Sequence, residues 1–114
     1  MAKTIKLTLP YPPSANRYWR KTNRGGVYLS AEAKAYKRDV GLLCRKILLS
    51  GDLILTLDFY RPKKQGDLSN RIKVLEDALQ GIYYEDDKQI TEIHARRFED
   101  KNNPRVEILI TEKF

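Results

Sequence analysis

The residues best suited to chemistry lie between Gly66 and Ile90, where aspartates stand at both ends of one segment. Asp67 comes at the expected start of a helix, and Asp86 and Asp87 come just before an expected strand. Hard divalent cations such as Mg²⁺ prefer carboxylate oxygens and keep several waters, so two or three aspartates can form a site. A cation held there can activate water and neutralise a phosphate under attack.

The same aspartates also have a purely structural interpretation, which stays open at this point. Aspartate is a preferred helix N-cap and a preferred turn residue. Asp67 would then cap a helix, while Asp86 and Asp87 would form an acidic turn before a strand. Composition alone favours this interpretation over a metal site.

An amphipathic helix is predicted between the aspartates. Asn70, Lys73 and Asp77 fall on one side of it, and apolar residues recur at helical spacing on the other, at Leu68, Ile72, Leu75 and Leu79, with Ala78 at the edge. Gly81 is expected to end the helix. The chain can then return and place Asp86 or Asp87 near Asp67.

The remaining pattern predicts an α+β fold. A second helix is expected from a Ser30 cap to about Leu49, with its core side formed by Ala33, Tyr36, Val40, Leu43 and Ile47. Alternating apolar residues predict four strands, at 4–9, 52–60, 89–98 and 105–111. The last two strands are expected to form a hairpin. We therefore predict a single domain over residues 1–114, with two helices packed on a four-stranded mixed sheet in the order β-α-β-α-β-β.

Composition restricts the partners and the chemistry. The formal net charge is +7, which favours a polyanionic partner such as nucleic acid. Cys44 is the only cysteine and His94 the only histidine, so an intrachain disulfide, a cysteine zinc cluster and a histidine metal cluster are excluded. The sequence shows no long apolar run, so we expect no membrane partner and a cytoplasmic protein.

Two basic segments are candidates for binding DNA. The long connection after Pro10 interleaves aromatic rings with arginines, which can stack on bases and grip phosphates; alternatively, Tyr18 and Trp19 pin this connection to the core. A second basic loop leads into Asp67. The predicted DNA-binding residues are Asn16, Arg17, Tyr18, Trp19, Arg20, Lys21, Arg24, Arg61, Lys63, Lys64, Asn70 and Lys73.

Three motifs, taken in order, resemble one family over nearly the whole chain. They are TLPYPPSANRYWR, then VYLSAEAKAYKRDV, then GDLSNRIKVLEDAL followed by YEDDKQI. The chain resembles the RusA family of Holliday junction resolvases. The resemblance implies a RusA-like domain and a homodimeric endonuclease, often from a phage or prophage. Such an enzyme binds branched DNA at four-way junctions and makes symmetric paired cuts with Mg²⁺, or with Mn²⁺ as a substitute.

The resemblance also implies roles for individual residues. Asp67, Lys73 and Asp87 match the catalytic positions, and Asp67, Asp86 and Asp87 match the metal site. Asn70 matches the signature asparagine, and Asp77 an acidic position further along the helix. This chain departs from the family pattern at Ser69, where the signature has a second aspartate.

The departure at Ser69 leaves three interpretations. A hydroxyl is a weaker oxygen ligand than a carboxylate, so Asp86, Asp77 or a substrate phosphate would have to compensate. Otherwise the chain is a junction-binding module with weak or no cleavage, or it carries an engineered or acquired inactivating change. An RNA-binding domain is not favoured, because neither a KH pattern nor an RRM aromatic signature is present.

Overall fold

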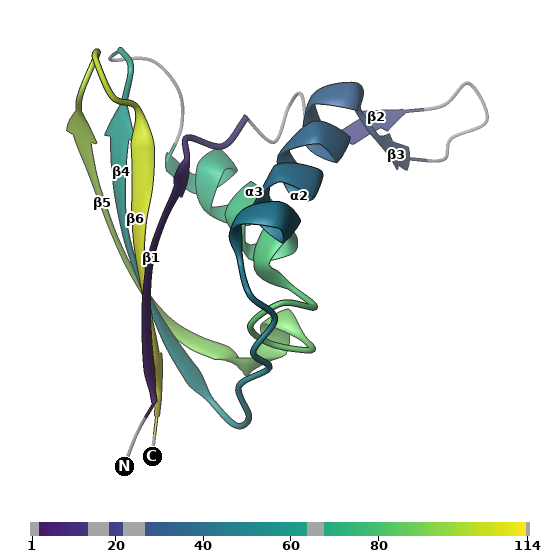
Figure 1. The fold of residues 1–114 in the computed structure, drawn as a ribbon, viewed down its shortest axis with the longest axis vertical. Coiled ribbons are helices and arrows are strands. Elements are labelled where there is room, and N and C mark those ends of the chain that lie inside the picture. The colour runs from purple at the N-terminus through teal and green to yellow at the C-terminus, as the bar shows by residue number, and fades with distance from the viewer. Residues whose placement is uncertain (1–2, 14–18, 22–26, 64–67, 114) are drawn as a thin grey trace.

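The computed structural model describes residues 3–13, 19–21, 27–63 and 68–113 as two helices covering one face of a four-stranded sheet (Figure 1). The α+β prediction is therefore confirmed. In chain order the elements are β1 (Thr4–Pro10), β2 (Trp19–Lys21), β3 (Val27–Leu29), α2 (Ala31–Leu43), β4 (Leu53–Arg61), α3 (Leu68–Leu79), the 3-10 turn η1 (Asp87–Gln89), β5 (Ile90–Glu99) and β6 (Arg105–Glu112).

The sheet is mixed, with the strand order β1-β6-β4-β5. β4 is antiparallel to β6 and parallel to β5, so the predicted hairpin between β5 and β6 is wrong. β4 is apolar on its whole inner face and takes the more buried central place between them. Parallel strands need a long crossover connection, and α3 provides it between β4 and β5. The consequence for the site is that α3 and the start of β5 belong to one β-α-β unit.

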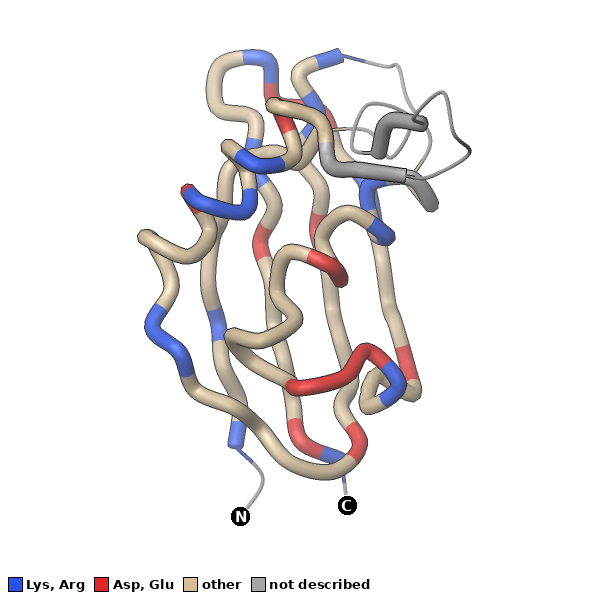
Figure 2. Tube along the Cα trace, turned by 90° about the vertical axis from the view of Figure 1, so that its right-hand side faces the viewer, with Lys and Arg blue, Asp and Glu red and all other residues tan. Residues whose placement is uncertain are grey.

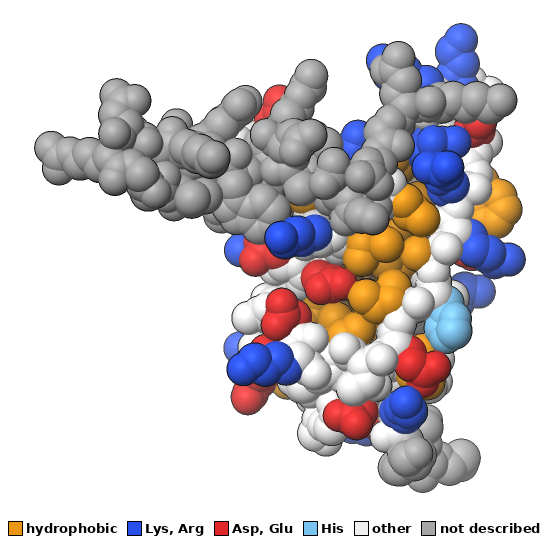
Figure 3. All heavy atoms as spheres, turned by 180° about the vertical axis from the view of Figure 1, so that it is seen from behind, with side chains coloured by type: hydrophobic (Ala, Val, Ile, Leu, Met, Phe, Trp, Pro, Cys, Tyr) orange, Lys and Arg blue, Asp and Glu red, His pale blue; other side chains and the backbone are white. Residues whose placement is uncertain are grey.

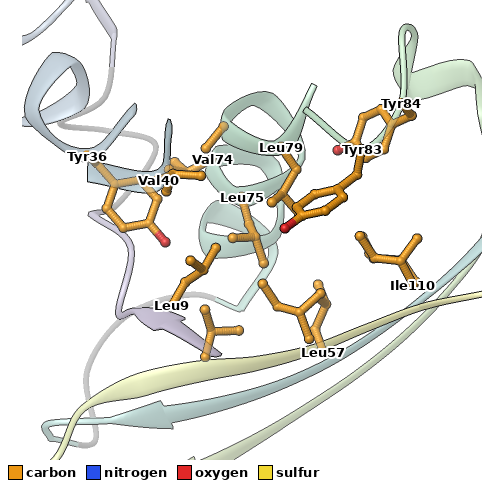
Figure 4. Packing of buried hydrophobic residues seen from close by; sticks show 14 of the residues in the cluster. Leu9, Tyr36, Val40, Leu57, Val74, Leu75, Leu79, Tyr83, Tyr84 and Ile110 are labelled. Atoms are coloured by element: carbon orange, nitrogen blue, oxygen red, sulfur yellow. The ribbon is translucent and has the colours of Figure 1, made fainter. Parts of the chain in front are cut away.

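The core lies between the sheet and the two helices (Figure 4). β4 contributes alternate fully buried side chains, because successive residues of a strand face opposite sides of the sheet. Leu75 and Leu79 of α3 pack against them with no exposed surface. Burial of each such leucine contributes about 1.5–3 kcal/mol. This packing fixes the depth and orientation of α3.

α2 is shorter than predicted. Ser30 caps it as expected, since its Oγ accepts from Ala33 N at 3.2 Å. The helix ends at Leu43, however, and the following residues to Leu49 are not helical. Ile47 N instead donates to Ile82 O at 2.9 Å, and Leu49 N donates to Tyr83 O at 2.8 Å.

Two of the five predicted core residues of that helix are consequently exposed. Leu43 is 62% exposed and Ile47 is 39% exposed, while Ala33, Tyr36 and Val40 are buried as predicted. The periodic pattern continues past Leu43, but tertiary hydrogen bonds to the segment after α3 replace the last helical turns. Local helix preference is weak enough for such contacts to override it.

β2 and β3 pair antiparallel as a separate two-stranded ribbon. The residues that join them, which include Gly25 and Gly26, lie outside the described residues. In Figure 1 this ribbon stands beyond the N-terminal end of α2, on the side of the helices away from the sheet.

Candidate functional site

The candidate site lies where the chain leaves α3 and folds back along it. Gly81 has a φ of +87°, a left-handed conformation that glycine adopts without strain, so the helix ends where predicted. The buried Tyr84 then ties the returning segment to the helix: its hydroxyl donates to Glu76 O, and its carbonyl accepts from Gly81 N at 2.7 Å. Asp87 is thereby held beside α3.

A small pocket of about 140 Å³ lies between α3 and η1. Its lining combines one lysine, one amide and three carboxylates: Lys73, Glu76, Asp77, Gln80 and Asp87. The acidic run before η1 and the acidic positions of α3 lie on the same side of the molecule in Figure 2. Figure 3 shows one face of the molecule, on which acidic side chains border a strip of hydrophobic ones. Lys73 and Asp87, two of the predicted catalytic residues, therefore meet at one pocket.

Glu76 is a pocket carboxylate that the sequence analysis did not select. Its pKa is raised chiefly by burial and also by the nearby charge of Asp87, while Lys73 opposes the shift. A cation between the two carboxylates would relieve their mutual repulsion. The signal that could have identified Glu76 is its spacing: it lies one helical turn beyond Lys73, on the same side of α3.

Asp86 has a structural role in the turn that carries Asp87. Its Oδ1 accepts from Lys88 N at 2.9 Å, and this hydrogen bond lowers the pKa of Asp86. The carboxylate thus caps η1. The structural interpretation of an acidic turn describes this residue well, and its predicted role as a metal ligand stays a prediction.

Gln89 joins this turn to the segment after α2, a role that the sequence analysis did not foresee. Its Oε1 accepts from Glu85 N at 3.0 Å and from Asp86 N at 3.2 Å. Its Nε2 donates to Leu49 O and Gly51 O, both at 3.0 Å. One side chain thereby links the acidic turn to a segment nearly forty residues earlier in the chain.

Arg71 links the proline-rich segment to α3. Its Nη1 donates to Pro12 O at 2.8 Å, and its guanidinium lies 5.0 Å from the ring centre of Tyr11. The connection that carries the predicted DNA-binding aromatics therefore begins close to the helix of the candidate site. No periodic pattern or motif in the sequence indicates this contact.

Several predicted residues are only partly described or not described. Asp67 and Lys64 lie outside the described residues, as do Asn16, Arg17, Tyr18 and Arg24. For Trp19, Arg20, Lys21, Ser69 and Asn70 only the backbone is described. Lys63 is exposed, whereas the Arg61 side chain is only 12% exposed and lies 3.5 Å from Glu99. The DNA-binding assignments stay predictions.

The donor set of the pocket fits a hard cation. Within the described part of the chain, no group of three or more His, Cys, Asp or Glu side chains is arranged to hold a metal ion. The pocket itself contributes Glu76, Asp77 and Asp87. That absence does not extend to Asp67, which lies outside the described residues. Carboxylate oxygens without sulfur or imidazole suit Mg²⁺ or Mn²⁺ rather than zinc.

Fold and pocket together define a small basic α+β domain in which carboxylates and a lysine converge beside the crossover helix. No helix within the described ranges is long and apolar enough to cross a membrane. The chain matches the family described as endodeoxyribonuclease RusA over residues 10–111. It belongs to that family.

Individual relatives match over nearly their full length. The chain is 33% identical to the crossover junction endodeoxyribonuclease RusA of Escherichia coli K12, with 96% of this chain and 95% of the relative covered. The proteins of the same name from Shigella sonnei and from Enterobacteria phage 82 show the same identity and coverage. The resemblance inferred from the three motifs is thus confirmed.

Proposed function

We propose that this chain is a metal-dependent endonuclease that binds four-way DNA junctions as a homodimer and resolves them by paired symmetric cuts. One observation carries the proposal. Lys73 and Asp87, the described members of the predicted catalytic set, line the same pocket although fourteen residues separate them. The names of the relatives give the substrate class, and the net charge of +7 suits a polyanionic partner.

Asp87 and Asp67 are the proposed ligands of Mg²⁺ or Mn²⁺. A divalent cation bound there supplies positive charge at the phosphate and lowers the pKa of water. The turn that carries Asp87 is capped by Asp86 and held by Gln89, which supports this role. Lys73 is exposed at the rim of the pocket, where its ammonium can orient the scissile phosphate and stabilise negative charge that develops on it.

Cleavage of a labelled mobile four-way junction in Mg²⁺ and in Mn²⁺ tests the proposal. We expect paired nicks at symmetric positions, none in EDTA, and none on a linear duplex of the same sequence. Asp87→Ala should abolish cutting while junction binding at low salt is kept, because the removed carboxylate repels DNA. Normal cutting by Asp87→Ala would show that the site is assigned wrongly.

A second candidate is a junction-binding module without cleavage, and Ser69 is the observation that favours it. The comparison of the unaltered chain with Ser69→Asp separates the two. Paired nicks from the unaltered chain support the nuclease. Nicks only from Ser69→Asp indicate a resolvase scaffold disabled at one ligand, and tight binding without nicks from either protein indicates the binding module.

A further inference from the structure

We propose that Glu76 provides the carboxylate that the cation site lacks at Ser69. This inference deepens the proposed function and rests on it. It assigns to Glu76 the role of a metal ligand. Glu76 lies on the same helix as Ser69, about two turns further along.

Position 69 and Glu76 fall on one stripe of α3. Seven residues make almost two full turns of an α-helix, so positions 69, 73, 76 and 80 follow one another along one side. Lys73, Glu76 and Gln80 of this stripe line the pocket. Long helical side chains generally lean toward the N-terminus of their helix, which from Glu76 is the direction of Lys73 and position 69.

The pocket brings Glu76 together with Asp87. Both carboxylates border the same space of about 140 Å³, which a cation and its waters can share with a phosphate oxygen. The lining also includes Lys73 and Asp77, and Asp77 forms an ion pair with Lys37 of α2. Glu76 and Asp87 therefore give the pocket more negative charge than Lys73 balances, which attracts a divalent cation.

The other acidic candidates are engaged elsewhere. Asp77 Oδ2 lies 3.2 Å from Lys37 Nζ, so this carboxylate pairs with α2. Asp86 Oδ1 accepts from Lys88 N and caps η1. To bind a cation, Asp77 would have to leave its ion pair with α2, and Asp86 would have to stop capping η1. Glu76 can bind a cation at the pocket without breaking either interaction.

Tyr84 holds Glu76 and Asp87 in a fixed relation. Tyr84 is fully buried, and its hydroxyl donates to the backbone oxygen of Glu76. Tyr84 also lies only three residues before Asp87 in the chain. A cation site whose ligands are already in place loses little entropy when the ion binds. The helical turn of Glu76 and the turn of Asp87 are therefore joined before any cation arrives.

Binding of Mn²⁺ to the full-length protein without DNA tests the inference directly. The proteins are the unaltered chain, Glu76→Gln, Ser69→Asp and Ser69→Asp/Glu76→Gln. Glu32→Gln is the matched control, because it removes the same charge from the exposed first turn of α2. Titration calorimetry should show a Mn²⁺ affinity at least about tenfold lower for Glu76→Gln. The control should stay within about twofold of the unaltered chain, since a distant exposed charge acts weakly.

Ser69→Asp should restore the affinity in the double variant, because it returns the carboxylate to the usual position. Junction cleavage should follow the same order across the five proteins. Mn²⁺ should also raise the melting temperature of the unaltered chain more than that of Glu76→Gln, since an ion that binds only the folded state stabilises it. Similar melting temperatures in EDTA would show that Glu76→Gln folds normally.

The two proposals fail in different ways. If Glu76→Gln binds Mn²⁺ and cuts junctions as Glu32→Gln does, while Asp87→Ala does neither, the role of Glu76 is refuted and the nuclease stands. If neither the unaltered chain nor Ser69→Asp cuts, the nuclease is refuted. In that case a loss of Mn²⁺ binding in Glu76→Gln still supports Glu76 as a ligand, and unchanged binding refutes it.

Discussion

At the scale of single residues, the chemistry of this chain depends on which carboxylates are committed to structure. Asp86 and Asp77 carry the same charge as Asp87 and lie near it in sequence or in space. Asp86 caps a turn, and Asp77 pairs with Lys37. A sequence reveals which residues are acidic, but the hydrogen bonds and ion pairs of the folded state decide which of them can act as metal ligands.

Tyr84→Phe should weaken the candidate site without touching any of its carboxylates. The change removes the hydroxyl that donates to Glu76 O and leaves that oxygen with the hydrogen bond from Gln80 N. We expect a loss of about 1 kcal/mol in the free energy of unfolding, measured by urea denaturation. We also expect a lower Mn²⁺ affinity, because Glu76 and Asp87 are no longer held together.

Tyr36→Phe is the matched control for this change. Its hydroxyl donates to Pro10 O at 2.8 Å, outside the pocket, so the stability loss should be similar and the Mn²⁺ affinity unchanged. Equal effects of the two variants on Mn²⁺ binding would contradict a specific role for Tyr84.

At the scale of elements, η1 belongs to the candidate metal site, whereas the β2–β3 ribbon belongs to the predicted DNA-binding segment. η1 sets the direction of Asp87 at the end of the crossover from α3 to β5. The ribbon stands away from the sheet and carries part of the predicted DNA-binding segment. Metal affinity and DNA affinity should therefore respond to different substitutions.

Gln89→Leu should loosen the acidic turn. It removes an acceptor shared by Glu85 N and Asp86 N, and a donor to two carbonyls of the segment after α2. We expect a destabilisation of about 1–2 kcal/mol and faster amide hydrogen exchange at Glu85 and Asp86. Exchange rates equal to those of the unaltered chain would mean that the turn holds its shape without this side chain.

Replacing Arg20 and Lys21 together with alanine should weaken junction binding but not Mn²⁺ binding. Each phosphate contact that is lost should reduce the slope of log affinity against log salt by about 0.9. Binding titrations at several salt concentrations measure this slope. The matched control is alanine at Lys6 and Lys113, which removes the same charge from β1 and from the residue that follows β6. A control that lowers the slope equally would place the DNA elsewhere.

At the scale of the whole molecule, paired cutting requires two sites in one complex. A two-fold dimer supplies them on a junction whose opposed strands are related in the same way. Sedimentation should therefore give twice the chain mass of 13.3 kDa. This prediction rests on the proposed function.

Mixed dimers test that arrangement. When differently tagged unaltered chain and Asp87→Ala are combined and the heterodimer is isolated, we expect one nick per junction instead of two. The nicked strand should be the one beside the intact site. Two nicks from the heterodimer would show that one active site serves both strands, which would contradict the two-site arrangement.

The sequence by itself determined most of the secondary-structure elements and the residues whose side chains could take part in catalysis or metal binding. Alternation fixed the four main strands, helical spacing and Gly81 fixed α3, and the motifs around Lys73 and Asp87 identified the family. These features were readable because period, caps and short motifs are local properties of the chain.

Tertiary structure alone decided three further matters. β4 lies between β5 and β6, a strand order that depends on which strands pair and on which the local pattern carries no information. α2 ends at Leu43 because backbone groups of residues 47 and 49 find partners beyond α3. Glu76 reaches the pocket because Tyr84 and Gln89 fold a distant turn against its helix. Each depends on contacts between segments far apart in the chain, whose free energies exceed the weak local preferences that a sequence displays.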